Sequence, residues 1–488
     1  MEHKGPTAYP VERLRHRRAH PGSLAGSEDD CSKRSGRHGV ILAHGAAPRS
    51  HAPSARRARH RGRPRRATTA LVGTSRATVE RAGLLHDVVR ASFEHDVLPD
   101  LCAYTEIACL SSAFDSSWRE NGEIARAAEL LRGWCASRAV PGAAVEIVEL
   151  PGRSPVLFAE VDASEPERAR STALVYGHLD KQPPLGRWRE GLEPFRAVRE
   201  GDRLYGRGTA DDGYATFAAF QAFGALAATA TPHGRLLLLV ESGEESGSPD
   251  LASYLDALSA RIGQPDLVVC LDSGCVTYDR LWVTTSLRGN IVATLRVDVL
   301  DHGVHSGSAG GIVPSSFQVA RALLGRIEDA QTGEMLLPEL RAEVPRHRRD
   351  EVELLAAGYG FDAAGAFPTV DGLQLVGDDP AERILRGTWS PALAVTGADG
   401  LPALADAGNV LRPYTALKLS IRLPPGCSAE RAMDAVGAAL TTDPPHGARI
   451  QLTWEPPGDG WDAPEMAPWL DDAVGQASLA CFGAPPRS

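Results

Sequence analysis

The sequence lacks the long hydrophobic runs and the closely spaced cysteines that mark membrane proteins and small secreted proteins. No apolar run approaches the about 18 residues of a membrane span, and the N-terminus has no apolar signal-peptide core. The eight cysteines are scattered, without a Cys-x-x-Cys pair or a short disulfide-rich module. Such a distribution is typical of reduced thiols. We therefore expect a cytoplasmic protein with no membrane partner.

Basic residues are outnumbered by acidic ones outside the N-terminal segment. Residues 1–70 hold 16 Lys and Arg against 5 Asp and Glu, so the remaining residues carry a charge of −21 within the net −10. An acidic body argues against general nucleic-acid binding, which needs a basic face. The composition, 43% hydrophobic and 23% charged, is that of an ordinary globular protein, and 488 residues suffice for two or three domains.

The first 72 residues differ from the rest of the chain. They are rich in Arg, His, Gly, Pro and Ser, as in the run Arg56–Arg63, and they show no apolar periodicity. We therefore predict a disordered basic arm over residues 1–72. Two explanations stay open for it: an arm that binds nucleic acid, and a non-native extension from a wrongly placed start.

Three short apolar segments organise the part of the chain that follows. They are residues 173–176, 236–240 and 267–271, and we predict that each is a buried strand. Helical patterns separate them, which a parallel sheet requires. The remaining expected elements are helices over 78–98, 122–137, 213–228 and 249–258, and a hairpin over 143–150 and 155–161. The predicted fold class is therefore α/β with a mostly parallel sheet.

Each of the three strands leads to side chains that can bind a metal. The first ends in His178, the second leads to Glu244 and Glu245, and the third ends in Asp272. The carboxyl ends of strands hold the active sites of open α/β sheets. Adjacent carboxylates repel each other unless a cation or a proton lies between them. Acids are also common at helix N-termini without any such role.

Two further acidic positions support a metal site. Asp180 points to the same side as His178, so it can hold one imidazole nitrogen while the other faces a metal. Asp211 and Asp212 stand before a predicted helix, either as caps or as a carboxylate offering one oxygen to each of two metals. Mixed His and carboxylate ligands favour Zn²⁺, with Mn²⁺ or Co²⁺ as substitutes.

Four segments occur in a fixed order: GHLD, GRGTADD, ESGEESGS and LDSG. Together they resemble the dinuclear zinc hydrolases that include carnosinase-type dipeptidases, glutamate carboxypeptidases and acetylornithine deacetylase, over roughly residues 78–485. The resemblance implies two zinc ions bridged by Asp211. His178 and Asp272 would each bind a different ion, and Glu245 would complete one site.

The same resemblance implies catalytic roles and shows one departure. Glu244 would be the general base, and Asp180 would orient His178. The family often has a lysine after the paired aspartates, where this chain has Gly213. The resemblance thus predicts a zinc-dependent peptidase, with a dipeptide as the expected substrate and an N-acyl amino acid as the alternative.

Beyond residue 286 the pattern changes to mixed strands and helices. Strands are expected over 290–299, 415–423 and 449–454, and helices over 314–327 and 429–440. This mixture resembles the family's inserted α+β lid, which forms dimers, so we expect a homodimer. By the same resemblance His305, Asn409 and Arg422 would bind the substrate, and a flanked Arg such as Arg422 suits a carboxylate.

The last segment returns to the catalytic domain near Pro464 and is expected to form one helix over 468–482. The family's late histidine segment has no counterpart before Ser488. We therefore expect one zinc to bind tightly, dipeptide hydrolysis to be poor or absent, and a binding or dimerising protein to be the rival interpretation. The expected domains are the arm 1–72, the catalytic domain 73–286 with its incomplete return 459–488, and the lid 287–458.

Overall fold

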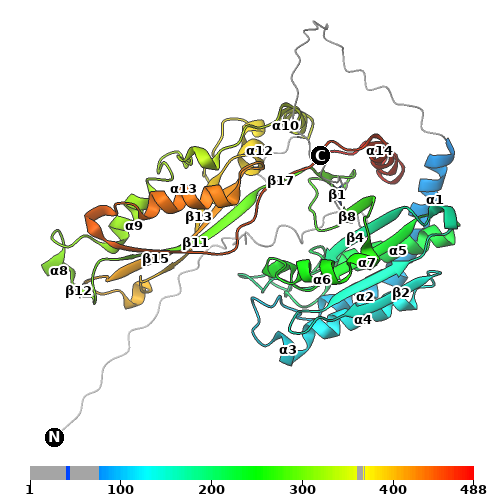
Figure 1. The fold of residues 1–488 in the computed structure, drawn as a ribbon, viewed down its shortest axis with the longest axis horizontal. Helices are drawn as coiled ribbons and strands as arrows, with labels where there is room; N and C mark the ends of the chain where they lie inside the picture. The colour runs from blue at the N-terminus through cyan, green and yellow to red at the C-terminus, as the bar shows by residue number, and fades with distance from the viewer. Residues whose placement is uncertain (1–39, 44–75, 360–366, 368) are drawn as a thin grey trace, which may run out of the picture.

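The computed structural model describes residues 40–43, 76–359, 367 and 369–488. The ribbon shows two lobes side by side, one containing β4 and β7 and the other containing β11 and β15 (Figure 1). Of the predicted basic arm, only Val40–Ala43 is described, and it forms strand β1. The rest of the arm lies outside the described residues, so its disorder stays a prediction.

A seven-stranded sheet forms the centre of the first lobe. The strand order is β2-β3-β7-β4-β8-β1-β9. Strands β7, β4 and β8 are parallel neighbours, whereas β3 pairs antiparallel with β7 and β1 pairs antiparallel with β8. The bounds are Ala143–Val148 (β2), Val156–Val161 (β3), Thr172–His178 (β4), Arg235–Glu241 (β7), Leu267–Cys270 (β8) and Val283–Thr284 (β9). The predicted α/β class, with its hairpin and parallel centre, is confirmed.

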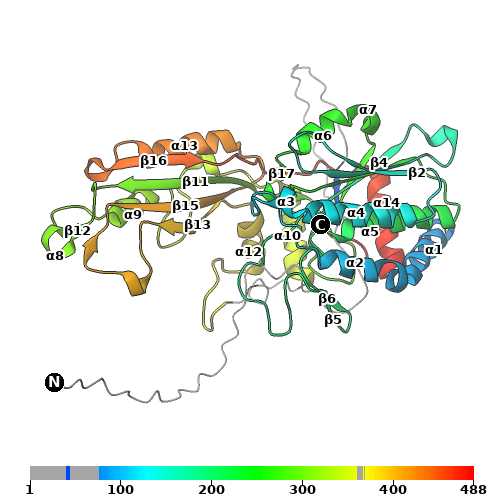
Figure 2. The same ribbon diagram turned by 90° about the horizontal axis from the view of Figure 1, so that it is seen from below.

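Helices cover both faces of this sheet. On one side lie α1 (Arg76–Ser92), a π-helical turn (Phe93–Val97), α2 (Leu98–Thr105), α4 (Glu123–Ser137) and α5 (Tyr214–Ala228). On the other lie α6 (Leu251–Ala257) and α7 (Ser259–Ile262), as Figure 2 shows edge-on. The single helix predicted over 78–98 is thus α1 followed by a π-helical turn, and helical structure continues into α2.

Strand β7 shows why the central segment is apolar throughout. Leu236, Leu238 and Val240 lie in the core under α2, α4 and α5, whereas Leu237 and Leu239 lie in the core under α6 and α7. Successive side chains of a strand point to opposite faces, so a strand covered on both faces needs apolar residues at every position.

The second lobe contains a four-stranded antiparallel sheet in the order β13-β15-β11-β16. Its strands are Gly289–Asp298 (β11), Ala392–Asp399 (β13), Tyr414–Leu423 (β15) and Arg449–Trp454 (β16). Helices α9 (Ser316–Leu324) and α13 (Ala429–Thr441) pack on it around Leu295, Leu419 and Leu440. The three strands and two helices expected from the sequence are present, whereas the edge strand β13 was not predicted.

Several smaller elements complete the described chain. In the first lobe these are α3 (Trp118–Asn121) and the hairpin β5 (Val198–Glu200) and β6 (Arg203–Tyr205). Beyond it are β12 (Val304–His305), α8 (Ser306–Ala309), α10 (Arg346–Tyr359), α12 (Pro380–Thr388) and β14 (Val410–Leu411). None of the helices in the described ranges is long and apolar enough to cross a membrane.

A two-stranded ladder connects the lobes. Strand β10 (Ser286–Leu287) pairs antiparallel with β17 (Trp461–Asp462), and the pairing continues where Asn290 and Gly458 exchange backbone hydrogen bonds of 2.9 Å. Arg348 of α10, only 5% exposed, donates to Asp462 Oδ1 at 2.8 Å. The chain then re-enters the first lobe as α14 (Pro468–Phe482), whose Leu470 and Val474 pack on Val283.

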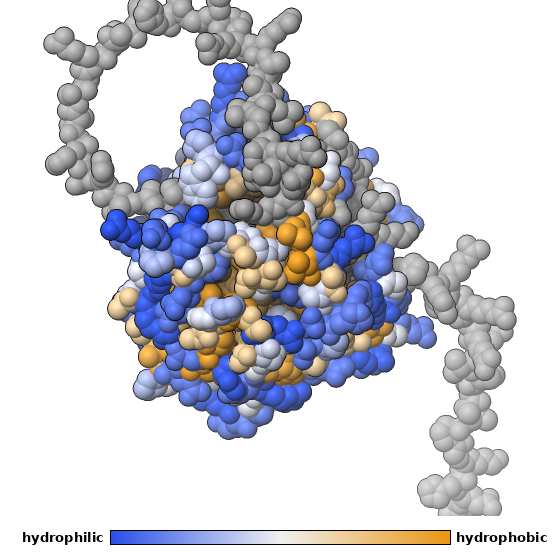
Figure 3. Space-filling model, turned by 90° about the vertical axis from the view of Figure 1, so that its right-hand side faces the viewer, coloured by the Kyte–Doolittle hydropathy of each residue, from blue (hydrophilic) through white to orange (hydrophobic). Residues whose placement is uncertain are grey.

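The first lobe exposes some apolar side chains. Figure 3 views the molecule from the side of α1, where hydrophobic residues lie among hydrophilic ones that dominate the rim. Exposed apolar side chains of α1 and α14 include Leu84, Trp469 and Leu479. Scattered apolar exposure of this kind is normal for a folded protein.

The packing of the parallel sheet predicts that shortening one of its core side chains lowers the stability of the protein. Leu238 is fully buried, so we expect Leu238→Ala to lower the free energy of unfolding by about 2–5 kcal/mol through lost burial and a cavity. Denaturant or thermal unfolding followed by circular dichroism measures this. Leu404→Ala, at a position that is 95% exposed, is the matched control and should change stability by less than about 0.5 kcal/mol. Equal effects of the two substitutions would contradict this packing.

Candidate metal centre

The ends of three parallel strands bring the predicted ligands together. His178 is the last residue of the central strand β4, Glu244 and Glu245 follow its neighbour β7, and Asp272 follows β8 on the other side. Because β4 lies between β7 and β8, the imidazole stands between acids that come from both sides. The geometry therefore follows from the strand order alone.

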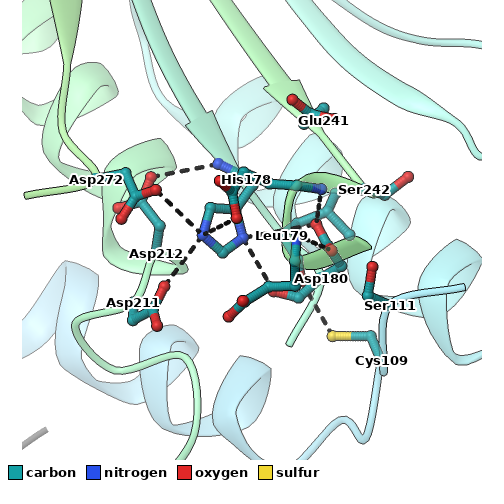
Figure 4. A network of polar contacts seen from close by, with 12 residues as sticks. Cys109, Ser111, His178, Leu179, Asp180, Asp211, Asp212, Glu241, Ser242 and Asp272 are labelled. Atoms are coloured by element: carbon teal, nitrogen blue, oxygen red, sulfur yellow. Dashed lines mark hydrogen bonds and ion pairs between the residues drawn. The ribbon is translucent and has the colours of Figure 1, made fainter. Parts of the chain in front are cut away.

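Two groups of side chains have ligand atoms within 4.8 Å of one another. The first is His178, Asp211 and Glu245, and the second is His178, Glu244 and Asp272. His178 Nε2 lies 3.1 Å from Asp211 Oδ1 and 3.9 Å from Asp272 Oδ2 (Figure 4). The same nitrogen lies 4.0 Å from Glu244 Oε2. In the described part of the chain, His178 is the one imidazole common to both groups.

Asp180 contacts both the other side of the imidazole and the acidic turn, which is the turn that carries Glu244 and Glu245. His178 Nδ1 lies 3.0 Å from the backbone oxygen of Asp180 and 3.5 Å from its carboxylate. That carboxylate accepts hydrogen bonds from the backbone N–H groups of Glu244 at 3.2 Å and Glu245 at 3.0 Å. Asp180, fully buried, therefore positions His178 mainly through its backbone and the two glutamates through its side chain.

Asp211 and Asp212 occupy different environments, and the peptide bond that joins them is cis. Asp211 faces His178, whereas Asp212 is fully buried and its Oδ2 accepts the backbone N–H of His178 at 3.3 Å. Asp212 Oδ1 has no hydrogen-bond partner among the described residues. Asp212 thus supports the end of β4 from behind, and Asp211 offers its oxygens to the site.

The carboxyl groups around His178 lie close together and partly buried, and both conditions change their pKa values. Burial raises the pKa of Glu244 from 4.5 to about 7, and the charge of Asp272 adds to this shift. Burial, followed by the charge of Asp211, also raises the pKa of Glu245, and burial raises that of Asp272. Burial opposes ionisation of Asp211 too, but its contact with His178 holds its pKa below the ordinary value. Without a cation, the cluster therefore retains protons.

The residues present fit a metal ion. One imidazole nitrogen and several carboxylate oxygens, 3.1–4.0 Å from that nitrogen, are spaced as ligands with bonds of about 2 Å would be. One oxygen of Asp212 has no hydrogen-bond partner among the described residues, and burial raises the pKa of this carboxyl well above its ordinary value. A mixed set of nitrogen and oxygen donors suits zinc, and it also accommodates manganese or cobalt.

Some supporting residues were not identified from the sequence. Gln182 donates its side-chain N–H to Glu245 Oε2 at 2.5 Å. Buried Glu241, at the end of β7, accepts a hydrogen bond from Ser248 at 2.8 Å and another from Tyr176. Gln182 lies two residues after Asp180 in a segment that leaves a ligand-bearing strand, and that position is the one signal that could have identified it.

Packing explains why this chain has Gly213 at the position where the family often has a lysine. A Cβ atom at this position would lie 2.0 Å from Tyr104 Cε1 and 2.5 Å from the backbone oxygen of Gly208. No side chain fits there without a shift of the Tyr104 ring, which is completely buried. A lysine at position 213 is therefore incompatible with the packing of Tyr104.

The three expected substrate-binding residues do not join the cluster within one chain. His305 lies in β12, at the end of the second lobe far from β4 (Figure 1), and Asn409 is beside it because its backbone oxygen accepts the N–H of Ser306. Arg422 lies on β15 opposite Asn290. No hydrogen bond or ion pair of the described residues connects any of these three side chains to the cluster.

The first lobe carries an imidazole–carboxylate cluster at the ends of its parallel strands, and the second lobe is built on an antiparallel sheet. Together they define a two-lobed α/β protein with a candidate metal centre. The chain belongs to Peptidase family M20/M25/M40, whose model matches residues 174–483. The family resemblance expected from the four sequence segments is therefore confirmed.

Individual relatives agree with this assignment. The chain is 27% identical over 298 residues to a cysteinylglycine-S-conjugate dipeptidase of Corynebacterium striatum, covering 60% of this chain and 62% of that protein. It is 28% identical over 276 residues to the human Beta-Ala-His dipeptidase, covering 56% and 53%. The chain thus matches somewhat more than half the length of these relatives.

Solved structures support the fold. The crystal structure of human carnosine dipeptidase 1 has a TM-score of 0.61 at 20% identity, covering 84% of this chain and 86% of that chain. The metallo-carboxypeptidase Sso-CP2 from Sulfolobus solfataricus has a TM-score of 0.62 at 18% identity, covering 80% and 84%. The two-lobed arrangement is therefore shared with these peptidases.

The raised pKa of Glu244 predicts how the stability of the metal-free protein depends on pH. The pKa is about 7 in the folded protein against an ordinary 4.5, so folding favours the protonated carboxyl. This contribution is complete below the lower value and is lost as the pH rises to the higher one. We expect the melting temperature of the metal-free protein to fall between about pH 5 and 7, and Glu244→Gln to make that fall shallower.

Glu129→Gln is the control for this measurement, since Glu129 lies on the exposed face of α4 with 57% of its side chain accessible. Its melting temperature should follow that of the unsubstituted protein at every pH. A pH profile of Glu244→Gln as steep as that of the control would show that Glu244 ionises normally in the fold.

Proposed function

We propose that this protein is a zinc-dependent dipeptidase. The observation that carries the proposal is that one imidazole and four carboxylates gather at the ends of adjacent parallel strands: His178, Asp211, Glu244, Glu245 and Asp272. The relatives named above are dipeptidases, which favours dipeptides over N-acyl amino acids. The eight cysteines are scattered without a Cys-x-x-Cys pair, which favours a reducing compartment such as the cytoplasm.

Four side chains would hold the zinc ions. His178 Nε2 lies 3.1 Å from Asp211 Oδ1 and 3.9 Å from Asp272 Oδ2, and Asp211 also lies beside Glu245. His178, Asp211, Glu245 and Asp272 would therefore be the ligands, and Asp211 would serve both ions.

When bound, the ions would lower the pKa of a water molecule and polarise the scissile carbonyl. Glu244 is the acid left for proton transfer, and its pKa of about 7 in the metal-free protein suits a group that accepts and then donates a proton. It takes a proton from the attacking water and delivers it to the amine nitrogen that leaves. The Asp180 carboxylate accepts the backbone N–H of Glu244 and so fixes the backbone that carries this side chain.

We further propose that the lobe formed by β11, β13, β15 and β16 is the lid and that it forms a homodimer. Strand β13 is an edge strand whose residues 394–399 are exposed, and unpaired edges readily accept a further strand. Dimer formation would allow the partner subunit's His305 to reach a substrate that His305 of the same chain does not approach. Asn409, adjacent to it, would travel with it, and Arg422 would bind the substrate carboxylate.

A Glu244→Gln variant tests the proton-transfer role. We expect dipeptide turnover to fall about 10²–10⁴-fold because the general base is lost, while zinc content stays as in the unsubstituted protein. Steady-state kinetics on Cys-Gly and β-Ala-His, with N-acetyl amino acids as competing substrates, and elemental analysis measure both. Glu129→Gln is the control. Turnover of acetylated amino acids but not of dipeptides would reject the dipeptidase and favour a deacylase.

Mixing two inactive variants tests the cross-subunit role. Each site would combine its own Glu244 with the partner subunit's His305, so Glu244→Gln and His305→Ala homodimers should both be weakly active. After subunit exchange, half of the dimers would carry one intact site, which restores about a quarter of the full activity. Light scattering should give about twice 51.9 kDa. A stable monomer at micromolar concentration, or no recovery on mixing, would contradict the dimer.

A further inference from the structure

A single lysine is buried beside the cluster. The sequence contains four lysines, Lys4, Lys33, Lys181 and Lys418, among its 52 basic residues. Of the two that the structure describes, Lys418 is half-exposed and pairs with Glu455, whereas Lys181 is only 1% exposed. Burying an ammonium group is costly unless all of its N–H donors find partners. The fold therefore has to supply hydrogen-bond acceptors for the Lys181 ammonium group.

The ammonium group of Lys181 is bound by the end of a helix. Its Nζ donates to the backbone oxygens of Tyr104 at 2.9 Å, Thr105 at 3.2 Å and Ile107 at 2.8 Å. These oxygens belong to the last residues of α2 and the segment after it, where helix carbonyls have no partner within the helix. An ammonium group has three donors, so these three contacts match its capacity.

The packing around Lys181 leaves no room for a different group. Its Nζ lies 4.1 Å from the centre of the Tyr104 ring, and the Tyr104 hydroxyl donates to the Leu179 backbone oxygen at 2.7 Å. A Cβ atom at Gly208, whose φ is +83°, would lie 2.5 Å from Lys181 Cε. A planar guanidinium would not fit this space or direct its donors to three carbonyls around one nitrogen.

A continuous chain of contacts leads from Lys181 to the acidic turn. The Lys181 N–H donates to the backbone oxygen of Cys109 at 2.9 Å, and the Ser111 N–H donates to that of Lys181 at 3.1 Å. Ser111 Oγ lies 2.5 Å from Ser246 Oγ, which also accepts the Ala113 N–H at 2.9 Å. Ser246 directly follows Glu245. Residues 105–113 therefore connect the lysine to the two glutamates.

We propose that Lys181 is a positioning residue for the metal centre: its ammonium group fixes residues 105–113, which in turn fix Glu244 and Glu245 through Ser246. The turn is then held from two sides, by the Asp180 carboxylate at its backbone and by Ser111 at Ser246. The inference rests on the zinc site proposed above, but its first consequence concerns the metal-free protein and does not depend on which substrate is cleaved.

Lys181→Met tests this proposal, because methionine has a similar length without the charge or the donors. In the metal-free protein, we expect amide hydrogen exchange over residues 105–113 and 243–248 to become about tenfold faster or more, with exchange in α9 and α13 unchanged. Zinc affinity, measured against a chromophoric chelator, should fall about 10–100-fold, as it does when outer contacts of metal ligands are lost. Dipeptide kcat should fall while KM changes little.

The matched control is Lys418→Met, which should leave exchange in both segments and the zinc affinity unchanged. The proposal would be overturned if Lys181→Met bound zinc within twofold as tightly as the unsubstituted protein and showed unchanged exchange over 243–248. This holds even if its melting temperature fell, because a lysine that only stabilises the fold would give that result. If the unsubstituted protein binds zinc but cleaves no dipeptide, the proposed function fails while exchange and affinity still decide the role of Lys181.

Ser246→Ala provides an independent test if Lys181→Met does not fold. It removes the contact between Ser111 and Ser246 while Lys181 stays in place. Amide exchange over 105–113 and 243–248 should therefore accelerate, and zinc affinity should fall. Where both variants fold, the losses of zinc binding in the double variant should be smaller than the sum of the single losses, since both substitutions break one connection. Additive losses, or an unchanged zinc affinity in Ser246→Ala, would overturn the proposal.

Discussion

Repulsion between acids is the constraint on which this structure depends. Asp211, Glu244, Glu245 and Asp272 are brought within a few ångströms of one imidazole by the order of β7, β4 and β8. Without a cation, repulsion and burial would push the carboxylates apart or leave them protonated, and the pKa values of Glu244, Glu245 and Asp272 are raised accordingly. Asp180 and Gln182 hold Glu245 in place against this repulsion, and Asp212 holds the backbone of His178.

Much of the first lobe could be predicted from the sequence because its signals are local. A strand buried on both faces, such as β7, is a continuous apolar run, and the metal-binding side chains directly follow such runs. Since parallel strands end at the same edge, chain order was enough to predict that His178, Glu244 and Asp272 would lie together. The hairpin of β2 and β3 and the helix α14 likewise follow local patterns.

Contacts between distant segments could not be predicted in this way. Nothing near Lys181 in the sequence indicates that α2 and the residues directly after it, some 75 residues earlier, would place three carbonyls around it. The pairing of Val40–Ala43 with β8 depends equally on a distant segment. His305 and Arg422 have the residue types that substrate binding needs, but their distance from the cluster follows from how the second lobe is attached, which local patterns do not encode.

The ladder of β10 and β17 determines how the second lobe can move. Two antiparallel segments, hydrogen-bonded to each other and anchored by Arg348, form the narrow connection between the lobes. Because β12 lies at the end of the second lobe far from this connection, a small rotation about the connection would displace His305 by much more than it displaces residues near the ladder. Such a rotation would leave the internal geometry of both sheets unchanged.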